Sequence, residues 1–434
     1  MSEPPESVPQ SRTARLMLAA LVALGLLARL ALALMMGDAQ ATRLPESSEY
    51  LAIGRSAADG DGFMLPGRGA GPAATRHPGP DAEKGPVGPA EFARRMPGYP
   101  ALIAAANRMT SAPLRTVLVV QAVCGGLALG LAAWAAARLA GLWAGLVAVA
   151  LLAFDPYRVY FAALAVPVTP VGLALAAAMA LGLKFIAAVE SGSCRAWVWG
   201  AATGLAVAAA AYFEPWAVGL VVPIGVAAAV ARERRRFLAG WAAGAAVLLV
   251  CLAPWLIRNT VRLGVPILTT LTGERLFEGT LTQRGLPLPS EKAREAEGLD
   301  EVGQDVFYLR SALGEMADAP AQWLKLAALR VGRLWSPGPI LEGGDEAIHP
   351  AAGYTSLLPT AALALVGVWM LRRQRATVVW LLLAPLWLTC VHAVLASPPP
   401  ERLEVMPALA VLGGAGLMAL VGRRSAPHAE AKAS

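Results

Sequence analysis

Charged residues are scarce in this sequence. Asp, Glu, Lys and Arg make up only 15% of its 434 residues, whereas 56% are hydrophobic. Soluble domains usually have about 25% charged and about 45–50% apolar residues. The composition therefore argues against a soluble enzyme and excludes a disordered or collagen-like chain. It indicates a helical membrane protein.

Cysteine and histidine are also few, with four of each. No two cysteines form a CxxC pair, so we interpret them as small core residues, not as zinc ligands or a disulfide scaffold. The histidines are isolated, and His392, inside an apolar run, is interpreted as a hydrogen-bonded core residue. No G-x-G-x-x-G motif opens a strand–helix unit, so a nucleotide-binding fold is not expected.

Basic patches with interleaved aromatic residues are absent, although the net charge is +7. We therefore expect no nucleic acid partner. Basic residues instead flank apolar runs, as the positive-inside rule predicts for cytoplasmic segments. The clusters are Arg12 and Arg15; Arg232, Arg234, Arg235 and Arg236; Arg372, Arg373 and Arg375; and Arg423 and Arg424. Both termini are expected in the cytoplasm, with the chain in the plasma (inner) membrane.

Long apolar runs predict a polytopic, all-α membrane protein with about ten transmembrane helices. The runs cover residues 16–36, 116–137, 139–183, 196–231, 238–257, 354–371, 376–396 and 403–421. One crossing needs about 20 residues, so the two longest runs are expected to be helical hairpins. Their breaks are expected at Asp155-Pro156-Tyr157-Arg158 and at Glu214-Pro215. With ten crossings, all four basic clusters lie on the cytoplasmic side.

Two large external loops are then expected, residues 37–115 and residues 258–353. Chemistry is expected there because the cytoplasmic loops are short. Residues 60–89 contain 14 Gly or Pro and are interpreted as a flexible insert. Ala321 to Trp335 carries apolar residues at helical spacing and predicts an interfacial helix.

The predicted organisation has five parts. They are a cytoplasmic N-terminus (1–13), spans one to seven with the first external loop (14–257), the second external loop (258–353), spans eight to ten (354–421) and a cytoplasmic tail (422–434). The first span can also be read as a signal peptide ending at Ala39-Gln40-Ala41. Its length and the interrupting Arg29 favour an uncleaved span.

Two carboxylates stand out just beyond the first span. Glu46 and Glu49 are three residues apart, so a helix would place them on one face. Tyr50 follows directly. The position in an external loop makes both acids candidates for catalysis. The alternative is a solvated helix start, where Ser and Glu are favourable.

Outer-face arginines are the second signal. Arg94 and Arg95 precede a Pro-Gly-Tyr-Pro turn that contains Tyr99. Arg258 ends span seven and Arg402 begins span ten. A guanidinium group binds phosphate through two hydrogen bonds, so an anionic lipid is one candidate ligand. The alternatives are an ordinary turn and an interfacial anchor.

The order of these motifs resembles the GT-C membrane glycosyltransferases of the family-39 type. That family includes protein O-mannosyltransferases and bacterial aminoarabinose transferases. The shared order is a span, an acid before Tyr, a Gly-Phe turn, the Arg-x-Pro-Gly-Tyr-Pro segment, the segment from Pro254 to Gly264, and a late Arg before the last span. The resemblance covers residues 14–421.

The resemblance implies an enzyme that moves a sugar from a polyprenyl-phosphate carrier to an acceptor hydroxyl or phosphate, on the extracytoplasmic face and with inversion. Its partners would be the polyprenyl-phosphate-linked sugar, membrane lipids, and an acceptor that is an envelope glycan, lipid or protein. No cofactor is certain. A divalent cation is possible, because some relatives hold one near the carboxylate.

The resemblance also implies roles for single residues. Glu46 fits the catalytic carboxylate, four residues before Tyr50, and Glu49 is the reserve candidate. The expected donor-phosphate ligands are Arg258, Arg402 and Arg95. The expected substrate-positioning residues are Tyr50, Tyr99 and Glu214.

Two departures from the family pattern leave other functions open. The outer loop after span three lacks the usual acid, and Glu214 stands where the family often has Arg. A catalytically inactive GT-C scaffold subunit is therefore an alternative. A lipid-linked-sugar transporter or flippase is another, suggested by Arg29, Pro167 and Pro170 within apolar runs. The large external loops favour the enzyme.

Overall fold

The computed structural model describes residues 12–65, 91–227, 231, 233–281, 290–337, 351–396 and 399–430. Within these ranges the regular elements are helices, and the only extended pairing is a single bridge between Leu65 and Glu91. The predicted all-α class is thereby confirmed. Most of the expected insert at 60–89 lies outside the described residues.

Eight helices of the described chain are long and apolar enough to cross a membrane, which makes this a multi-pass membrane protein. They are α1 (Arg12–Met35), α5 (Pro113–Ala140), α8 (Val168–Glu190), α9 (Ala196–Phe213), α11 (Arg234–Leu263), α16 (Ala351–Met370), α17 (Arg375–Val394) and α18 (Arg402–Glu430). Two shorter apolar helices are Leu142–Ala153, which is α6, and Pro215–Gly225. The expected ten segments are reached when these two are included.

Both expected hairpin breaks are confirmed. After α6, the Asp155 side chain accepts hydrogen bonds from the backbone N–H groups of Tyr157 and Arg158 and caps the short helix α7 (Pro156–Phe161). A capping carboxylate and a proline at the first helical position start a new helix there. The second break follows Phe213, where the chain turns into η2 (Pro215–Leu220) and α10 (Val221–Val226).

Arg29 of α1 lies buried among apolar helices, and its charge is met by backbone oxygens. Its guanidinium group donates to the carbonyls of Gly25, Leu152 and Ala153, at 2.7, 3.1 and 2.9 Å respectively. Two of these carbonyls belong to the end of α6, where helix carbonyls lack partners of their own. Arg29 therefore joins α1 to α6, and its contacts give no support to a transport pathway.

Glycines allow α9 and α11 to pack closely. Gly200 and Gly204 of α9 face Gly240 and Gly244 of α11. A Cβ atom added at Gly204 would lie 2.1 Å from the carbonyl oxygen of Gly244, and one at Gly200 would lie 2.2 Å from that of Gly240. Spacing of small residues by four is the usual device for close contact between membrane helices.

We expect Gly204→Val to force these two helices apart and to destabilise the protein by about 2 kcal/mol, the usual cost of overpacking. The melting temperature of the purified protein in detergent measures the effect. Gly130→Val in α5 is the matched control, because a Cβ there would meet nothing within 4 Å. Equal melting temperatures for the two variants would contradict the packing described here.

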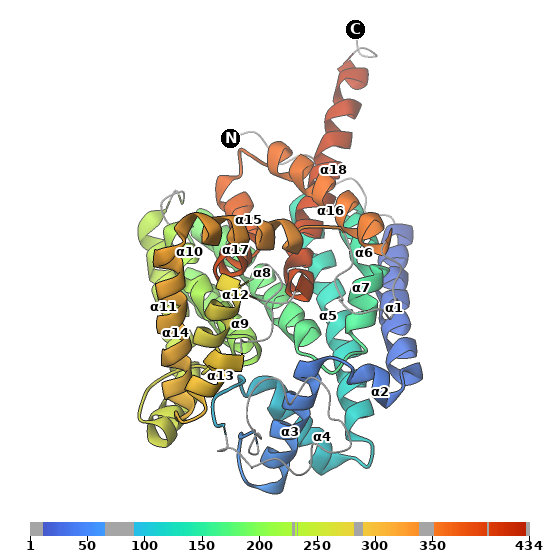
Figure 1. The fold of residues 1–434 in the computed structure, drawn as a ribbon. Coiled ribbons are helices and arrows are strands. Elements are labelled where there is room, and N and C mark those ends of the chain that lie inside the picture. The colour runs from blue at the N-terminus through green and yellow to red at the C-terminus, as the bar shows by residue number, and fades with distance from the viewer. Residues whose placement is uncertain are drawn as a thin grey trace.

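Most of the remaining helices belong to the two expected external loops. They are α2 (Asp38–Ala41), α3 (Pro45–Asp59), α4 (Gly98–Met109), α12 (Thr272–Leu281), α13 (Ser290–Ala296), α14 (Glu301–Asp318) and α15 (Pro320–Leu334), whereas η4 (Pro399–Glu401) lies between α17 and α18. Figure 1 shows α3 and α4 together at one end of the bundle, beside α5.

The helix expected over Ala321–Trp335 is present as α15. Ala327, Arg330 and Leu334 are buried, and Arg330 donates to the carbonyls of His392 and Ala393 near the end of α17. Its opposite side exposes apolar residues such as Leu324. An exposed apolar side suits a helix at the membrane surface, and that location stays a prediction.

Candidate active site

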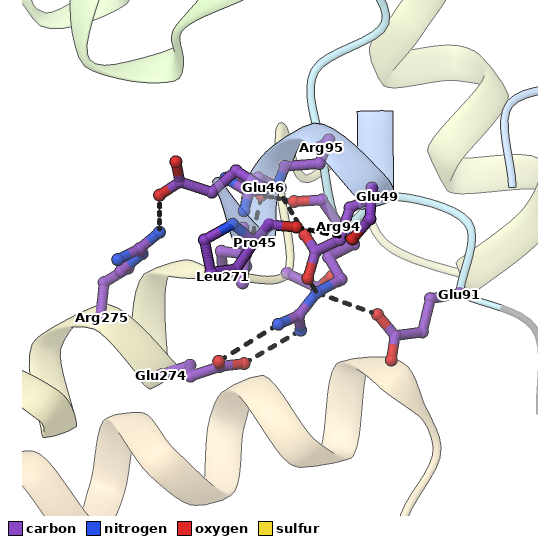
Figure 2. Close-up of polar contacts among 12 residues, drawn as sticks. Pro45, Glu46, Glu49, Glu91, Arg94, Arg95, Leu271, Glu274 and Arg275 are labelled. Carbon is purple, nitrogen blue, oxygen red and sulfur yellow. Dashed lines mark hydrogen bonds and ion pairs between the residues drawn. The ribbon is translucent and has the colours of Figure 1, made fainter. Parts of the chain in front are cut away.

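The first helix of the site, α3, presents two carboxylates on one face. Pro45 occupies its first turn, where a missing N–H costs nothing, and Glu46 follows in the same turn. Glu49 comes three residues later and faces the same cluster of charges (Figure 2). Tyr50 is buried on the side toward α4. The expected helical spacing of the acids is confirmed.

Glu49 is held firmly by two arginines. Arg95 Nε lies 2.8 Å from one carboxylate oxygen, and Arg94 Nε lies 3.4 Å from the other. The Glu49 residue is only 7% exposed. A buried carboxylate with two cationic partners is fixed in position. The geometry therefore gives Glu49 the features of an anchor between α3 and the segment before α4.

Arg94 is the hub of the cluster. It binds Glu274 of α12 through two hydrogen bonds of 3.0 and 3.2 Å, and Glu91 lies 3.4 Å from its Nε (Figure 2). Burial alone would lower the pKa of Arg94, but Glu274, Glu49 and Glu91 outweigh it and raise the pKa. For Glu274, burial acts to raise the pKa, and Arg94 lowers it below its ordinary value. Through these ion pairs Arg94 joins the loop of residues 37–115 to the loop of residues 258–353.

Glu46 has a different environment. Its carboxylate lies 3.5 Å from the guanidinium of Arg275 on α12, and the two side chains are 25% and 26% exposed. Arg275 also lies 3.6 Å from Glu278 and donates to the carbonyl of Ala396 at 3.4 Å. Figure 2 shows Glu46 pointing away from the buried Arg94 pairs, toward Arg275. Glu46 is thus accessible and beside a cation.

Two tyrosines form an apolar wall of the site. The rings of Tyr50 and Tyr99 meet edge to face, with centroids 5.1 Å apart, and the guanidinium of Arg95 lies 5.1 Å from the Tyr50 centroid. The Tyr99 hydroxyl donates to Gln121. Burial raises the pKa of both phenols well above the ordinary value, and the charge of Glu214 adds to the shift at Tyr50. Both therefore remain neutral.

Glu214 lies at the end of α9, against the segment before α4. The carbonyl of Tyr212 is so close that a Cβ at Gly98 would lie 2.6 Å from its oxygen. Burial raises the pKa of Glu214 to about 7; Arg95 opposes this shift, and Glu46 adds to it. The structure thus brings Glu214 into the same electrostatic environment as Glu46 and Arg95.

Two further acids lie behind Glu214. Glu401 of η4 is buried, and a carboxylate oxygen lies 3.7 Å from Nε2 of His392. Glu404 of α18 is 1% exposed. Burial, together with the charge of Glu214, raises the pKa of Glu401 well above its ordinary value. Placing a negative charge on this group of buried acids therefore costs free energy.

Arg258 and Arg402 lie outside this cluster. Arg258 donates to the carbonyls of Phe92 and Phe63 at 2.5 and 2.7 Å, and its guanidinium lies 4.7 Å from the Trp255 ring centroid. Arg402 is 2% exposed and donates to the carbonyls of Leu334 and Ser336. Each joins backbone segments, and their expected contact with phosphate stays a prediction.

Solved structures place the architecture among known folds, whereas no protein-family model and no curated protein matches the chain. The oligosaccharyltransferase AglB from Archaeoglobus fulgidus, in complex with an inhibitory peptide and a dolichol-phosphate, matches 98% of this chain and 52% of its own, with a TM-score of 0.58 and 10% identity. Its apo form matches 91% and 50%, with a TM-score of 0.55 and 10% identity. The chain has a GT-C fold. It spans about half the length of these archaeal proteins.

A weaker likeness is to ArnT from Cupriavidus metallidurans bound to undecaprenyl phosphate, with a TM-score of 0.43, 14% identity, and coverage of 94% of this chain and 78% of that one. The GT-C architecture expected from the order of motifs is confirmed by the archaeal structures. Identities this low concern the fold, and the roles of single residues rest on the geometry of this chain.

The GT-C site contains residues that sequence reasoning missed. Glu274 and Arg275 lie in the second loop without a distinctive motif, and only folding brings them to Glu49 and Glu46. Glu404 had a usable signal, because an acid within an apolar run is usually functional or paired. In the part of the GT-C chain that the structure describes, no group of three His, Cys, Asp or Glu side chains has the geometry to hold a metal ion.

Proposed function

We propose that this protein is an integral-membrane glycosyltransferase that moves a sugar from a polyprenyl-phosphate carrier to an acceptor hydroxyl or phosphate, on the extracytoplasmic face of the plasma membrane, with inversion. The observation that carries the proposal is Glu46, an accessible carboxylate 3.5 Å from Arg275, on helix α3 in the loop that follows the first span of a GT-C fold. A protein with the same fold, AglB from Archaeoglobus fulgidus, is an oligosaccharyltransferase whose structure contains a dolichol-phosphate, and this supports the proposal.

Glu46 is the proposed base. An acceptor hydroxyl is a weak nucleophile, and a carboxylate that takes its proton makes the oxygen reactive. That oxygen then bonds to the anomeric carbon from the face opposite the phosphate. The bond from this carbon to the phosphate oxygen breaks, and its electron pair stays on the phosphate. Glu49 is not the proposed base, because both of its carboxylate oxygens are paired with arginines. It instead holds α3 against the segment that contains Arg94 and Arg95.

Arg275 and Arg95 are the proposed stabilisers of the phosphate. Charge develops on the departing oxygen, and guanidinium groups fixed nearby lower the energy of that transition state. Arg275 is the more accessible, with 26% of its side chain exposed against 12% for Arg95. We prefer these two arginines to Arg258 and Arg402 as phosphate ligands. The guanidinium groups of Arg258 and Arg402 already donate to backbone carbonyls.

We expect Arg275→Ala to raise the KM for the lipid-linked donor and to lower kcat, each by about tenfold, because a charge-assisted contact contributes about 1.5–3 kcal/mol. Initial rates at varied donor concentration measure both constants. Arg310→Ala is the matched control, since Arg310 is exposed on α14. An unchanged donor KM would remove Arg275 from the phosphate site.

Two experiments test the function itself. Mass spectrometry of envelope glycans, lipids and glycoproteins from a deletion strain should show which sugar substituent disappears. The purified protein in lipid nanodiscs should then transfer that sugar from its polyprenyl phosphate to the identified acceptor. Movement of lipid-linked sugar across vesicles without a transferred product would favour a flippase, and neither activity would favour a scaffold subunit.

A further inference from the structure

The carboxyl group of Glu214 differs from the other acids of the site in its lack of polar partners within the part of the chain that the structure describes. Its side chain is half-buried, and among the described residues it makes no hydrogen bond and no ion pair. Glu46 and Glu49, by contrast, each have an arginine partner. A half-buried acid without a partner is costly to hold in its charged form, and such groups occur where chemistry requires them.

The position of Glu214 is fixed by the residues that precede it. Tyr212 meets the backbone of Gly98, and Phe213 packs against the cluster formed by Tyr50 and Tyr99. After Glu214, the Trp216 carbonyl accepts a hydrogen bond of 2.8 Å from the Trp387 indole. The carboxyl group is therefore held between rigid elements beside the Glu46 helix.

Charged and titratable groups act on Glu214 from every neighbouring element. They are Glu46 of α3, Arg95 before α4 and Arg275 of α12, and Glu214 in turn acts on Tyr50 of α3, Glu401 of η4 and Glu404 of α18. Burial is the largest influence and raises the pKa of Glu214 to about 7, against the opposing charges of Arg95 and Arg275. The charge of Glu214 in turn contributes to the raised pKa of the buried Glu401.

The two acids of the site therefore differ in environment. Glu46 is ion-paired and accessible, which suits a base, whereas Glu214 is enclosed and unpaired, which suits an acid. Environments that separate two carboxyl groups in this way assign the acid and the base.

We propose that Glu214 is the general acid of the transfer reaction and donates its proton to the phosphate oxygen that leaves the anomeric carbon. This proposal rests on the glycosyltransferase function. The acceptor oxygen bonds to the anomeric carbon and gives its proton to Glu46. The carbon–oxygen bond to phosphate breaks, and its electron pair binds the proton from Glu214.

The proton balance closes within the site. After transfer, Glu46 is protonated, Glu214 is ionised, and the carrier leaves as a singly protonated phosphate monoester. A proton then returns from Glu46 to Glu214, directly or through solvent, and restores both groups. A phosphate monoester has its second pKa near about 6, which is close to that of the proposed donor, so the transfer between them is well matched.

The test is the pH dependence of kcat in nanodiscs with the polyprenyl-phosphate-linked sugar. In the wild-type enzyme, kcat should fall above about pH 7, because ionised Glu214 has no proton to give. Glu214→Gln should lower kcat by about 10²-fold, remove this fall and leave the donor KM unchanged. Glu214→Asp should restore part of kcat and a pH-dependent fall. Glu190→Gln, exposed at the far end of α8, is the matched control.

The outcomes separate this proposal from the function on which it rests. An active wild-type enzyme whose Glu214→Gln variant keeps the wild-type pH profile, or loses only donor affinity, would overturn the role of Glu214 as the acid. A wild-type protein that transfers no sugar would instead overturn the function. Melting temperatures show whether Glu214→Gln is folded, and Glu214→Asp provides the same pH test if it is not.

Discussion

Replacing Glu46 with Gln is expected to lower sugar transfer by about 10³-fold, within the range known for loss of a positioned general base. The amide has nearly the same shape as the carboxylate but cannot take a proton from the acceptor. Because the Glu46 side chain is 25% exposed and has a single cationic partner at 3.5 Å, we expect the variant to insert and fold normally. Single-turnover transfer from a labelled donor in nanodiscs measures the loss.

Two control variants make that result specific. Glu278→Gln removes the other carboxylate beside Arg275, at 3.6 Å, and so reports how much of the loss comes from altered charge at that arginine. Glu49→Gln removes a buried anchor and should lower the melting temperature, which Glu46→Gln should not. Full activity of Glu46→Gln would exclude Glu46 as the base and return attention to Glu49.

The transmembrane architecture could be predicted because its physical cause is local. A segment must be about 20 residues long to cross the bilayer, and its composition alone shows that it is apolar. The breaks at Asp155 and Glu214 were equally readable, since each combines an acid with the proline that follows. What hydropathy did not show is the short length of α6, which has only 12 residues.

The sequence could predict only those contacts of the site that join residues close together in the chain. Glu46, Glu49 and Tyr50 share one helix, so their spacing placed them together. Arg275 reaches Glu46 across 229 positions in sequence, through a contact between two loops. Such pairs leave no periodic signal in the chain. Arg258 shows what residue type alone leaves open, because only the structure reveals that its guanidinium group donates to the backbone carbonyls of Phe92 and Phe63.

The contact between the two loops itself can be tested at Arg94. Arg94→Met is expected to destabilise the protein by about 3–5 kcal/mol, because it leaves the half-buried Glu274 without its bidentate cation and removes one of the two arginines that bind the buried Glu49. Thermal unfolding in detergent should show the loss, and hydrogen exchange should locate it in α3 and α12.

The double variant Arg94→Met with Glu274→Met separates the value of the ion pair from the cost of breaking it. Paired apolar side chains of similar size often replace a buried ion pair at little cost. The double variant should therefore be more stable than Arg94→Met alone, a coupling that neighbouring residues show and distant ones do not. If both variants melt at the wild-type temperature, the two loops do not depend on Arg94, and Glu46 must be held against Arg275 by other contacts.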